Sequence, residues 1–387
     1  MALYDVNGNE NKAYDINGNE VAGEYTPSVG YVTDPEYITI DNSPYRLVWH
    51  DEFDGKDLDK NFWNDVQFIG TKEKRYQAWT DYYLNDSKLH LRLKKDAPDC
   101  FIDDPDNNVA QSIIMSGQHN KLHILTPSYH DVNPFWGLIA QEGYYEHRFK
   151  MFKATGGCHV GLWTVGVQEG LNANKQLAEI DITEILASAT TSLPHGVHKW
   201  EDSSTTELYR SVSPNVDFAT DFHTLGFLWE NGVMKWYVDG ALVDTFNINT
   251  PQYPMIFIFS AYKRISGTGW TGDADTTLDT VEYQVEYFRI YKKATTQATS
   301  AVSVSNYTPI SINANIADMT IEDERGCPVC FPSYVYINWS DGTRTEHWVK
   351  WQTVKDTYRT KMTNHQSFDW DGYVYGLGLD IVANVTY

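Results

Sequence analysis

Hydrophobic and polar residues alternate with a period of two along much of this chain, whereas segments with the helical period are scarce. Residues 89–94 and 283–287 are two clear examples. Gly, Asn, Asp and Pro separate such runs, as they do at the turns between short strands. The pattern therefore predicts an all-β fold, with an antiparallel sandwich and a concave sheet over residues 37–293.

The segment 179–184, Glu-Ile-Asp-Ile-Thr-Glu, predicts a strand with one apolar and one acidic face. Residues two apart on a strand share a face, so Glu179 and Asp181 point the same way. Glu184 is five positions from Glu179 and would point to the opposite face of a regular strand. We predict a bulge near Thr183, which would return Glu184 to the acidic face.

Three carboxylates on one face repel each other, so at least one should retain its proton near neutral pH. Such a division is typical of retaining glycoside hydrolysis, in which one carboxylate attacks the anomeric carbon and a carboxyl about 5–5.5 Å away protonates the leaving oxygen. We therefore predict Glu179 as nucleophile, Glu184 as acid/base and Asp181 as the residue that tunes the nucleophile. Among 52 acidic residues, this spacing is expected on the order of once by chance, so the flanking sequence must decide.

The flanks resemble glycoside hydrolase family 16, the laminarinase, agarase and lichenase group. The resemblance covers roughly residues 36–293 and keeps the order of the family's motifs. The matching segments are residues 47–55, 143–150, 157–163, 195–198, 222–229, 236–240 and 285–291. It implies a β-jelly roll whose concave sheet forms a substrate cleft crossed by the strand at 179–184. No cofactor for catalysis is expected.

The resemblance also implies residues that bind substrate in this cleft. They are Trp163, His159, His198, Trp200, Trp270, Trp79 and Arg75. Trp270 lies in a glycine-rich loop and is expected to be a sugar platform, because a surface Trp on a loop has few structural uses. His159 stands where the family often has Trp, and Arg75 lies where laminarinase-like members tend to have Asn-x-Glu. These departures weaken any transfer of glucan specificity.

Several of these residues also have structural interpretations. Trp163 could equally be a core residue, and His198 a structural histidine rather than a partner of a substrate hydroxyl or a carboxylate. Arg75 could meet an acidic or sulfated group, or be a solvated loop charge. Many family members hold a calcium ion on the convex side through a Glu and an Asp; Glu52 matches the first and Glu286 replaces the second, so these two form a candidate structural Ca2+ site.

A chain of 387 residues suggests two or three domains. We divide it into an N-terminal repeat or adaptor segment at 1–35, the jelly roll at 36–293, a small polar linker at 294–306, and a β module at 307–387. The last part resembles a bacterial Ig-like β-sandwich. It is expected to space or attach the catalytic part, or else to bind carbohydrate through an exposed strip of Trp348, Trp351 and Trp370.

The first twenty residues hold a decapeptide repeat, with Asn-Gly turn signals at positions 7–8 and 17–18. It resembles N-terminal segments of some phage structural proteins, so an assembly partner is expected there. No apolar run of about 18 residues and no basic-apolar leader is visible, so no membrane insertion is expected. The expected location is extracellular, or associated with a phage or cell surface.

Charge and aromatic content indicate the kind of partner. The net charge of −22 would repel nucleic acid, whereas a neutral or cationic glycan fits better. The 13 Trp and 26 Tyr supply flat sugar platforms, although a β core should take most of them. A β-linked polysaccharide or oligosaccharide is the expected ligand.

Three functions compete at this point. The first is a retaining endo-β-glycanase acting on a β-1,3-glucan or on a galactan such as an agar-type glycan. The second is a non-catalytic glycan-binding protein on the same scaffold, and the third is a phage or surface structural protein. Loss of reducing-end release with retained polysaccharide affinity in Glu179→Gln would separate the first from the second.

Overall fold

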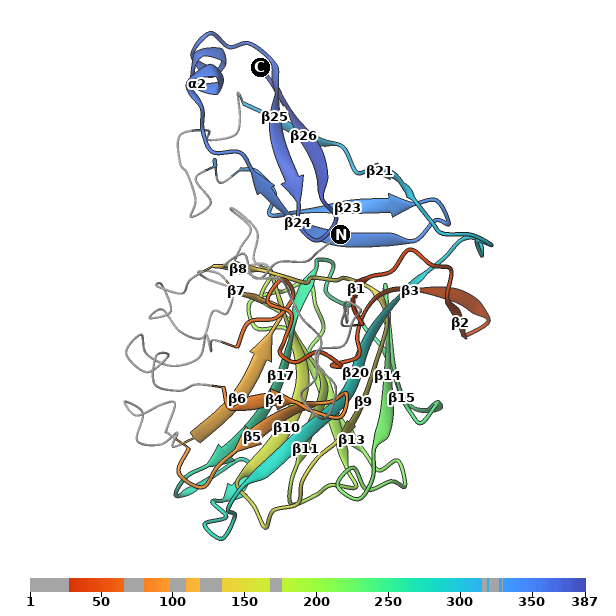
Figure 1. The fold of residues 1–387 in the computed structure, drawn as a ribbon, viewed down its shortest axis with the longest axis vertical. Coiled ribbons are helices and arrows are strands. Elements are labelled where there is room, and N and C mark those ends of the chain that lie inside the picture. Colours follow the sequence, from red (N-terminus) through yellow and green to blue (C-terminus); the bar gives the residue numbers. More distant parts are fainter. Residues whose placement is uncertain are drawn as a thin grey trace, which may run out of the picture.

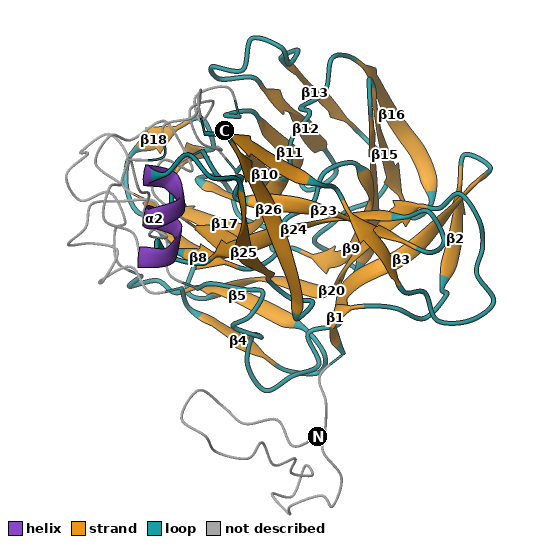
Figure 2. Cartoon of the chain, turned by 90° about the horizontal axis from the view of Figure 1, so that it is seen from above, coloured by secondary structure: helices purple, strands orange, loops and turns teal. Residues whose placement is uncertain are grey.

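The computed structural model describes residues 28–65, 80–97, 109–118, 134–167, 176–314, 319, 327–328 and 330–387. These residues form two β-rich parts, the larger one N-terminal (Figure 1). Within these ranges the one helix is α2 (Asp356–Thr363), and no helix there is long and apolar enough to span a membrane (Figure 2). The predicted all-β class is confirmed.

The larger part consists of two facing antiparallel sheets. The first, here called the β20 sheet, has the strand order β1-β3-β20-β9-β14-β15-β16. In addition, β2 pairs with β3, β5 pairs with β20, and β4 pairs with β5. Its strands are β1 (Val29–Tyr31), β2 (Tyr37–Ile40), β3 (Ser43–Asp51), β4 (Tyr82–Leu84), β5 (Leu89–Leu93), β9 (Gly143–Lys150), β14 (His223–Glu230), β15 (Val233–Val238), β16 (Ala241–Asn247) and β20 (Val281–Lys293).

The second sheet, here called the β11 sheet, has the order β13-β12-β11-β10-β17-β6. Its strands are β6 (Val109–Met115), β10 (Cys158–Gly166), β11 (Glu179–Leu186), β12 (Leu193–His198), β13 (Leu208–Val212) and β17 (Met255–Arg264). Two short ribbons complete this part: β7 (Gly117–Gln118) with β8 (Phe135–Trp136), and β18 (Thr268–Gly269) with β19 (Gly272–Asp273).

The core of the larger part lies between the two sheets. Alternation on β17 sends Phe257 and Phe259 inward, where they meet Phe288 of β20 at ring-centroid distances of 5.1 and 5.5 Å. Trp49 of β3 packs against Phe288 from the same side, at 5.9 Å. Each such burial stabilises the fold by roughly 1.5–3 kcal/mol. The aromatic-rich core expected from the composition is therefore present.

The C-terminal part is a smaller β module with the strand order β21-β23-β24-β25-β26-β22, in which β22 and β26 are parallel. Its strands are β21 (Val304–Tyr307), β22 (Ile310–Asn313), β23 (Tyr334–Trp339), β24 (Arg344–Trp351), β25 (Phe368–Val374) and β26 (Leu379–Thr386).

The proposed exposed aromatic strip on this module is wrong. Trp348, Trp351 and Trp370 are each at most 1% exposed. Trp351 and Trp370 lie in the module's own core, where their indole nitrogens donate to the carbonyls of Pro332 and Gln352. Trp351 and Trp370 are therefore core residues of the module rather than an exposed sugar-binding strip.

Two of the predicted segment boundaries cut across observed strands. β1 lies within the segment assigned to the adaptor, yet it pairs with β3 in the register Val29↔Asp51. β21 begins at Val304, inside the predicted linker. Three-residue strands and polar edge strands carry little hydrophobic pattern, so backbone pairing alone identifies them. The N-terminal decapeptide repeat lies outside the described residues.

Candidate active site

Strand β11 contains the predicted bulge. Against β10, Thr183 pairs with Leu162 and Asp181 pairs with Trp163, so Ile182 is the extra residue. Glu184 lies opposite Gly161. The bulge prediction is confirmed, and it brings Glu179, Asp181 and Glu184 to one cleft.

Two hydrogen bonds hold this bulge in place. The hydroxyl oxygen of Thr183 accepts from the backbone N–H of Leu162 at 2.9 Å, and Trp236 of β15 donates to the carbonyl of Ile182 at 3.0 Å. Both contacts satisfy backbone groups near the point where the regular ladder is interrupted. Gly161 is required opposite the bulge, because a Cβ there would lie 2.9 Å from the carbonyl oxygen of Thr183.

The cleft has a volume of about 370 Å3 and lies on the face of the β11 sheet opposite the core. Seven of the predicted residues line it: Glu179, Asp181, Glu184, His159, Trp163, Trp200 and Trp270. Trp270 is 60% exposed, as expected for a platform on a loop. The neighbouring residue, Gly269, packs closely against Arg264. A Cβ at this position would lie only 2.2 Å from a guanidinium nitrogen of Arg264.

The two outer acids have different partners. The indole nitrogen of Trp200 donates to Oε2 of Glu179 at 3.1 Å, and the hydroxyl of Tyr209 donates to Oε2 of Glu184 at 2.9 Å. Burial raises the pKa of Glu184, while the Tyr209 hydroxyl acts in the opposite direction by stabilising the carboxylate. Glu184 is therefore the outer acid whose environment favours retention of a proton.

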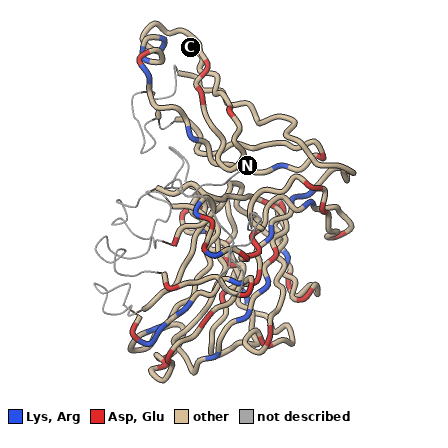
Figure 3. The backbone as a smooth tube through the Cα atoms, in the orientation of Figure 1, with Lys and Arg blue, Asp and Glu red and all other residues tan. Residues whose placement is uncertain are grey.

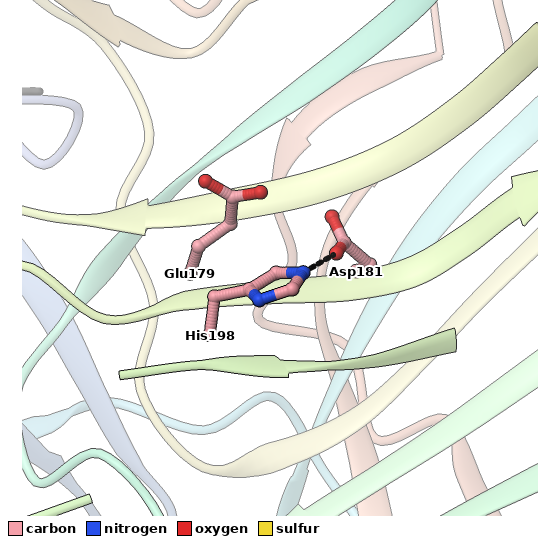
Figure 4. Close-up of side chains that lie close together, drawn as sticks. All are labelled: Glu179, Asp181 and His198. Atoms are coloured by element: carbon pink, nitrogen blue, oxygen red, sulfur yellow. Dashed lines mark ion pairs between the residues drawn. The ribbon is translucent and has the colours of Figure 1, made fainter. Parts of the chain in front are cut away.

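Asp181 and His198 form a pair in which Oδ2 and Nε2 lie 3.3 Å apart (Figure 4). Burial and the neighbouring charge of Glu179 raise the pKa of Asp181. The hydrogen bond to Asp181 in turn raises the pKa of His198 to about 9. Because both pKa values are raised, this pair retains at least one proton at neutral pH.

Acidic and basic residues outside this pair are spread over both parts of the molecule (Figure 3).

Aromatic rings form another wall of the cleft. His159 stacks on Tyr262 with ring centroids 4.3 Å apart and lies 4.8 Å from Trp270. Burial lowers the pKa of His159 to about 3, so its ring is neutral. Trp163 donates from its indole nitrogen to the hydroxyl of Ser260 at 3.0 Å. His159 thus supplies a flat, uncharged surface where the family often has Trp.

Several cleft residues were not predicted from the sequence. Ser260, Tyr262 and Arg264 alternate on β17 and line the cleft, but the continuous apolar run at 255–259 indicates only a buried strand and not which face meets the cleft. Tyr209 lies on β13, whose pairing with β12 places it beside the acids. No local pattern indicated that pairing.

Some predicted residues lie elsewhere. Arg75 and Trp79 fall outside the described residues. His195, in the matching segment 195–198, is buried on the core side of β12. Its Nε2 lies 3.0 Å from Oδ2 of Asp244, so this histidine is structural.

The carboxylates of the two candidate calcium ligands accept hydrogen bonds from arginines. Both carboxylate oxygens of Glu52 accept from Arg289 at 2.8 Å, and Glu286 accepts from Arg148 at 2.6 Å. As they stand, these two residues do not fit a calcium site, since an ion would have to displace the arginines. In the described ranges, the one group of three metal-ligand side chains is Glu179, Asp181 and His198.

Comparisons with known proteins agree with this geometry. Residues 140–289 match the model of the family described as glycosyl hydrolases family 16. Over 304 residues the chain is 25% identical to the glucan endo-1,3-beta-glucosidase A1 of Niallia circulans, covering 71% of this chain and 41% of that protein. A beta-glucanase of Paenibacillus polymyxa is 31% identical over 135 residues, covering 34% of this chain and 51% of that protein. The chain thus spans only about half the length of these relatives or less.

Two solved structures share the fold. A GlcNAcα1-4Gal-releasing endo-β-galactosidase from Clostridium perfringens has a TM-score of 0.58 at 20% identity, covering 88% of this chain and 94% of that chain. An endo-β-1,3-glucanase from Pyrococcus furiosus has a TM-score of 0.50 at 23% identity, covering 66% of this chain and 98% of that chain. These findings show that residues 140–289 are similar to glycosyl hydrolases family 16 and that the larger part shares the jelly-roll fold of the two solved structures.

Proposed function

We propose that this chain is an endo-acting β-glycanase that cleaves internal β-glycosidic bonds of a polysaccharide with retention of configuration. The observation that carries the proposal is the bulge at Ile182, because it brings Glu179, Asp181 and Glu184 into one cleft. The relatives named above as a glucanase and a glucosidase support the same reaction class.

In the first step, a carboxylate oxygen of Glu179 attacks the anomeric carbon and forms a covalent ester with the sugar. The bond from that carbon to the glycosidic oxygen breaks, and Glu184 gives its proton to the departing oxygen. The Trp200 indole, which donates to Glu179 in the free protein, fixes the carboxylate in the cleft.

In the second step, Glu184 is an anion and takes a proton from a water molecule. The water oxygen bonds to the anomeric carbon from the side that the leaving group vacated, and the ester bond to Glu179 breaks. The sugar is released with its original configuration, and both acids return to their starting states. Tyr209 stabilises the anionic form of Glu184 that this step requires.

Asp181 would act on the nucleophile through its proton. It is 4% exposed, lies two residues from Glu179 and shares a proton with His198. A proton kept on this pair lowers the repulsion between Asp181 and Glu179. His198 therefore serves as a positioning residue for Asp181.

The proposed substrate class is a β-linked polysaccharide, with β-1,3-glucan as the first candidate because of the relatives' names. Cleft rings at Trp270, His159 and Trp163 offer apolar surfaces to sugar rings. The neutral His159–Tyr262 stack differs from the family's usual Trp, so a galactan is the second substrate to test.

A panel of β-1,3-, β-1,4- and mixed-linkage glucans, agars, carrageenans and galactans tests the proposal. We expect one class to yield new reducing ends, with the β-anomer as the first product by proton NMR. Glu179→Gln should abolish release while retaining polysaccharide affinity. Glu184→Gln should slow natural substrates more than substrates with good leaving groups, and equal losses on both would contradict its acid role.

A further inference from the structure

The cleft face of the β11 sheet continues beneath the C-terminal module. On β17, Ser260 and Tyr262 line the open cleft, and the same alternation places Ile256 and Ile258 on that face. These two isoleucines belong to an apolar cluster separate from the main core. One face of one strand thus forms the cleft at one end and a buried apolar surface at the other.

Trp348 of β24 covers this apolar surface. It is 1% exposed and packs in the same cluster as Ile256 and Ile258, with Ile113 of β6 and Val165 of β10. Its ring lies 4.9 Å from that of Trp136 of β8. Figure 1 shows β23 and β24 beside the end of the sandwich that carries β7 and β8.

The cluster extends to the cleft itself. Trp163 and Tyr262 are partly buried, pack against this cluster and also line the cleft. Trp163 neighbours Val165 on β10, two residues along the same face, and pairs with Asp181 in the ladder. Trp348 is therefore linked to the cleft wall through one layer of packed side chains.

Buried ion pairs fix the module in this position. Nζ of Lys292 lies 2.6 Å from Oε2 of Glu346, with side chains 6% and 2% exposed. Nε of Arg46 lies 2.8 Å from Oδ2 of Asp341, and both side chains are fully buried. Both pairs join a strand of the β20 sheet to the module, so they form only while the two parts are docked. This arrangement differs from that of a module attached by a flexible linker.

We propose that the C-terminal module is a built-in support of the substrate cleft, and that Trp348 positions Trp163 and Tyr262 for polysaccharide binding. The effect on polysaccharide binding that this proposal predicts rests on the proposed function. The three acids are bound by Trp200, Tyr209 and His198, whereas Trp348 packs in the apolar cluster. Its loss should therefore weaken substrate binding more than it slows the chemical step.

The test compares Trp348→Leu with Trp351→Leu in the full chain. Both tryptophans are 1% exposed on β24, but Trp351 packs within the module, against Phe331. Each substitution should destabilise the module, whereas only the first removes a contact with the β11 sheet. Trp348→Phe retains part of the ring contact and serves as the conservative variant.

Two readouts are measured at a temperature at which circular dichroism shows each variant folded. We expect Trp348→Leu to speed amide hydrogen exchange in peptides covering residues 255–264 and to raise KM about tenfold, equivalent to ~1.4 kcal/mol of binding, with kcat changed less than threefold. Trp348→Phe should fall between this variant and the parent, and Trp351→Leu should match the parent in both readouts.

Equal effects of Trp348→Leu and Trp351→Leu, or no effect of the first, would overturn the proposal. If Trp348→Leu does not fold, Trp348→Phe against Trp351→Phe makes the same comparison with smaller changes. If the chain cleaves no glycan, the exchange comparison still decides whether Trp348 supports the β11 sheet, so failure of this inference is distinct from failure of the proposed function.

Discussion

Oδ2 of Asp181 lies 3.3 Å from Nε2 of His198, a contact between neighbouring strands that joins a buried carboxyl to a half-buried imidazole. Because the hydrogen bond to Asp181 is the main cause of the raised His198 pKa, we expect the His198 resonances to titrate near pH 9 by NMR. In Asp181→Asn the pKa should fall toward its ordinary value of 6.5. An unchanged titration would show that Asp181 does not hold the proton on this histidine.

The hydrogen bond from Tyr209 to Glu184 predicts an effect of Tyr209 on the upper pH limit of activity. Its hydroxyl stabilises the carboxylate and so lowers the pKa of Glu184, against the raising effect of burial. Tyr209→Phe removes the lowering contribution, so the pKa of Glu184 should rise and the alkaline limb of the kcat/KM profile should move to higher pH.

The matched comparison is His223→Asn, since His223 pairs with Asp239 in the β20 sheet and lines no part of the cleft. Its profile should overlay that of the parent. An alkaline limb that moves to lower pH in Tyr209→Phe would contradict the assigned contact.

Thr183 holds the bulge through its hydroxyl oxygen. Thr183→Val keeps the shape but leaves the N–H of Leu162 buried without this acceptor, so the free energy of unfolding should fall by about 1–3 kcal/mol. Activity should fall as well, because the bulge aims Glu184. Thr164→Val on β10 is the control. Thr164 is also 1% exposed, but its hydroxyl has a long hydrogen bond of 3.4 Å to the Ile180 carbonyl and one of 3.0 Å to Sδ of Met255, a weak acceptor. Urea unfolding measures both variants, and a larger loss of unfolding free energy in Thr164→Val than in Thr183→Val would contradict the prediction.

Trp270 is the most exposed ring of the cleft and contributes little to the core. Trp270→Ala should therefore leave the melting temperature within about 2 °C of the parent, as for a surface substitution. The loss of a sugar platform should weaken oligosaccharide binding roughly tenfold, or ~1.4 kcal/mol. Calorimetric titration on the Glu179→Gln background measures this without turnover. Unchanged affinity would remove Trp270 from the binding surface.

The strand at 179–184 and its bulge were predictable because the information is local. Apolar and acidic positions alternate within six residues, and Glu184 reaches the acidic face only if one residue is extra. The fold class followed from the same period-two pattern over the larger part. Trp270 was predictable from its glycine-rich loop.

The relationships that sequence reasoning missed are long-range. Tyr209 reaches Glu184 only through the pairing of β12 with β13. The sequence places Trp348 in the C-terminal module, but its burial depends on apolar side chains of the distant strand β17, which belongs to the larger part. Glu52 looked like a calcium ligand, yet Arg289, 237 residues distant, occupies both of its oxygens.

The most direct test of the account is to trap the covalent intermediate. Glu184→Gln lacks the base for the second step, so with a β-glycoside of the sugar found in the panel and a good leaving group, the ester should accumulate. We predict that peptide mass spectrometry finds one added glycosyl unit on Glu179. Release of the leaving group with no adduct on any peptide, or with an adduct on a different residue, would contradict Glu179 as the nucleophile.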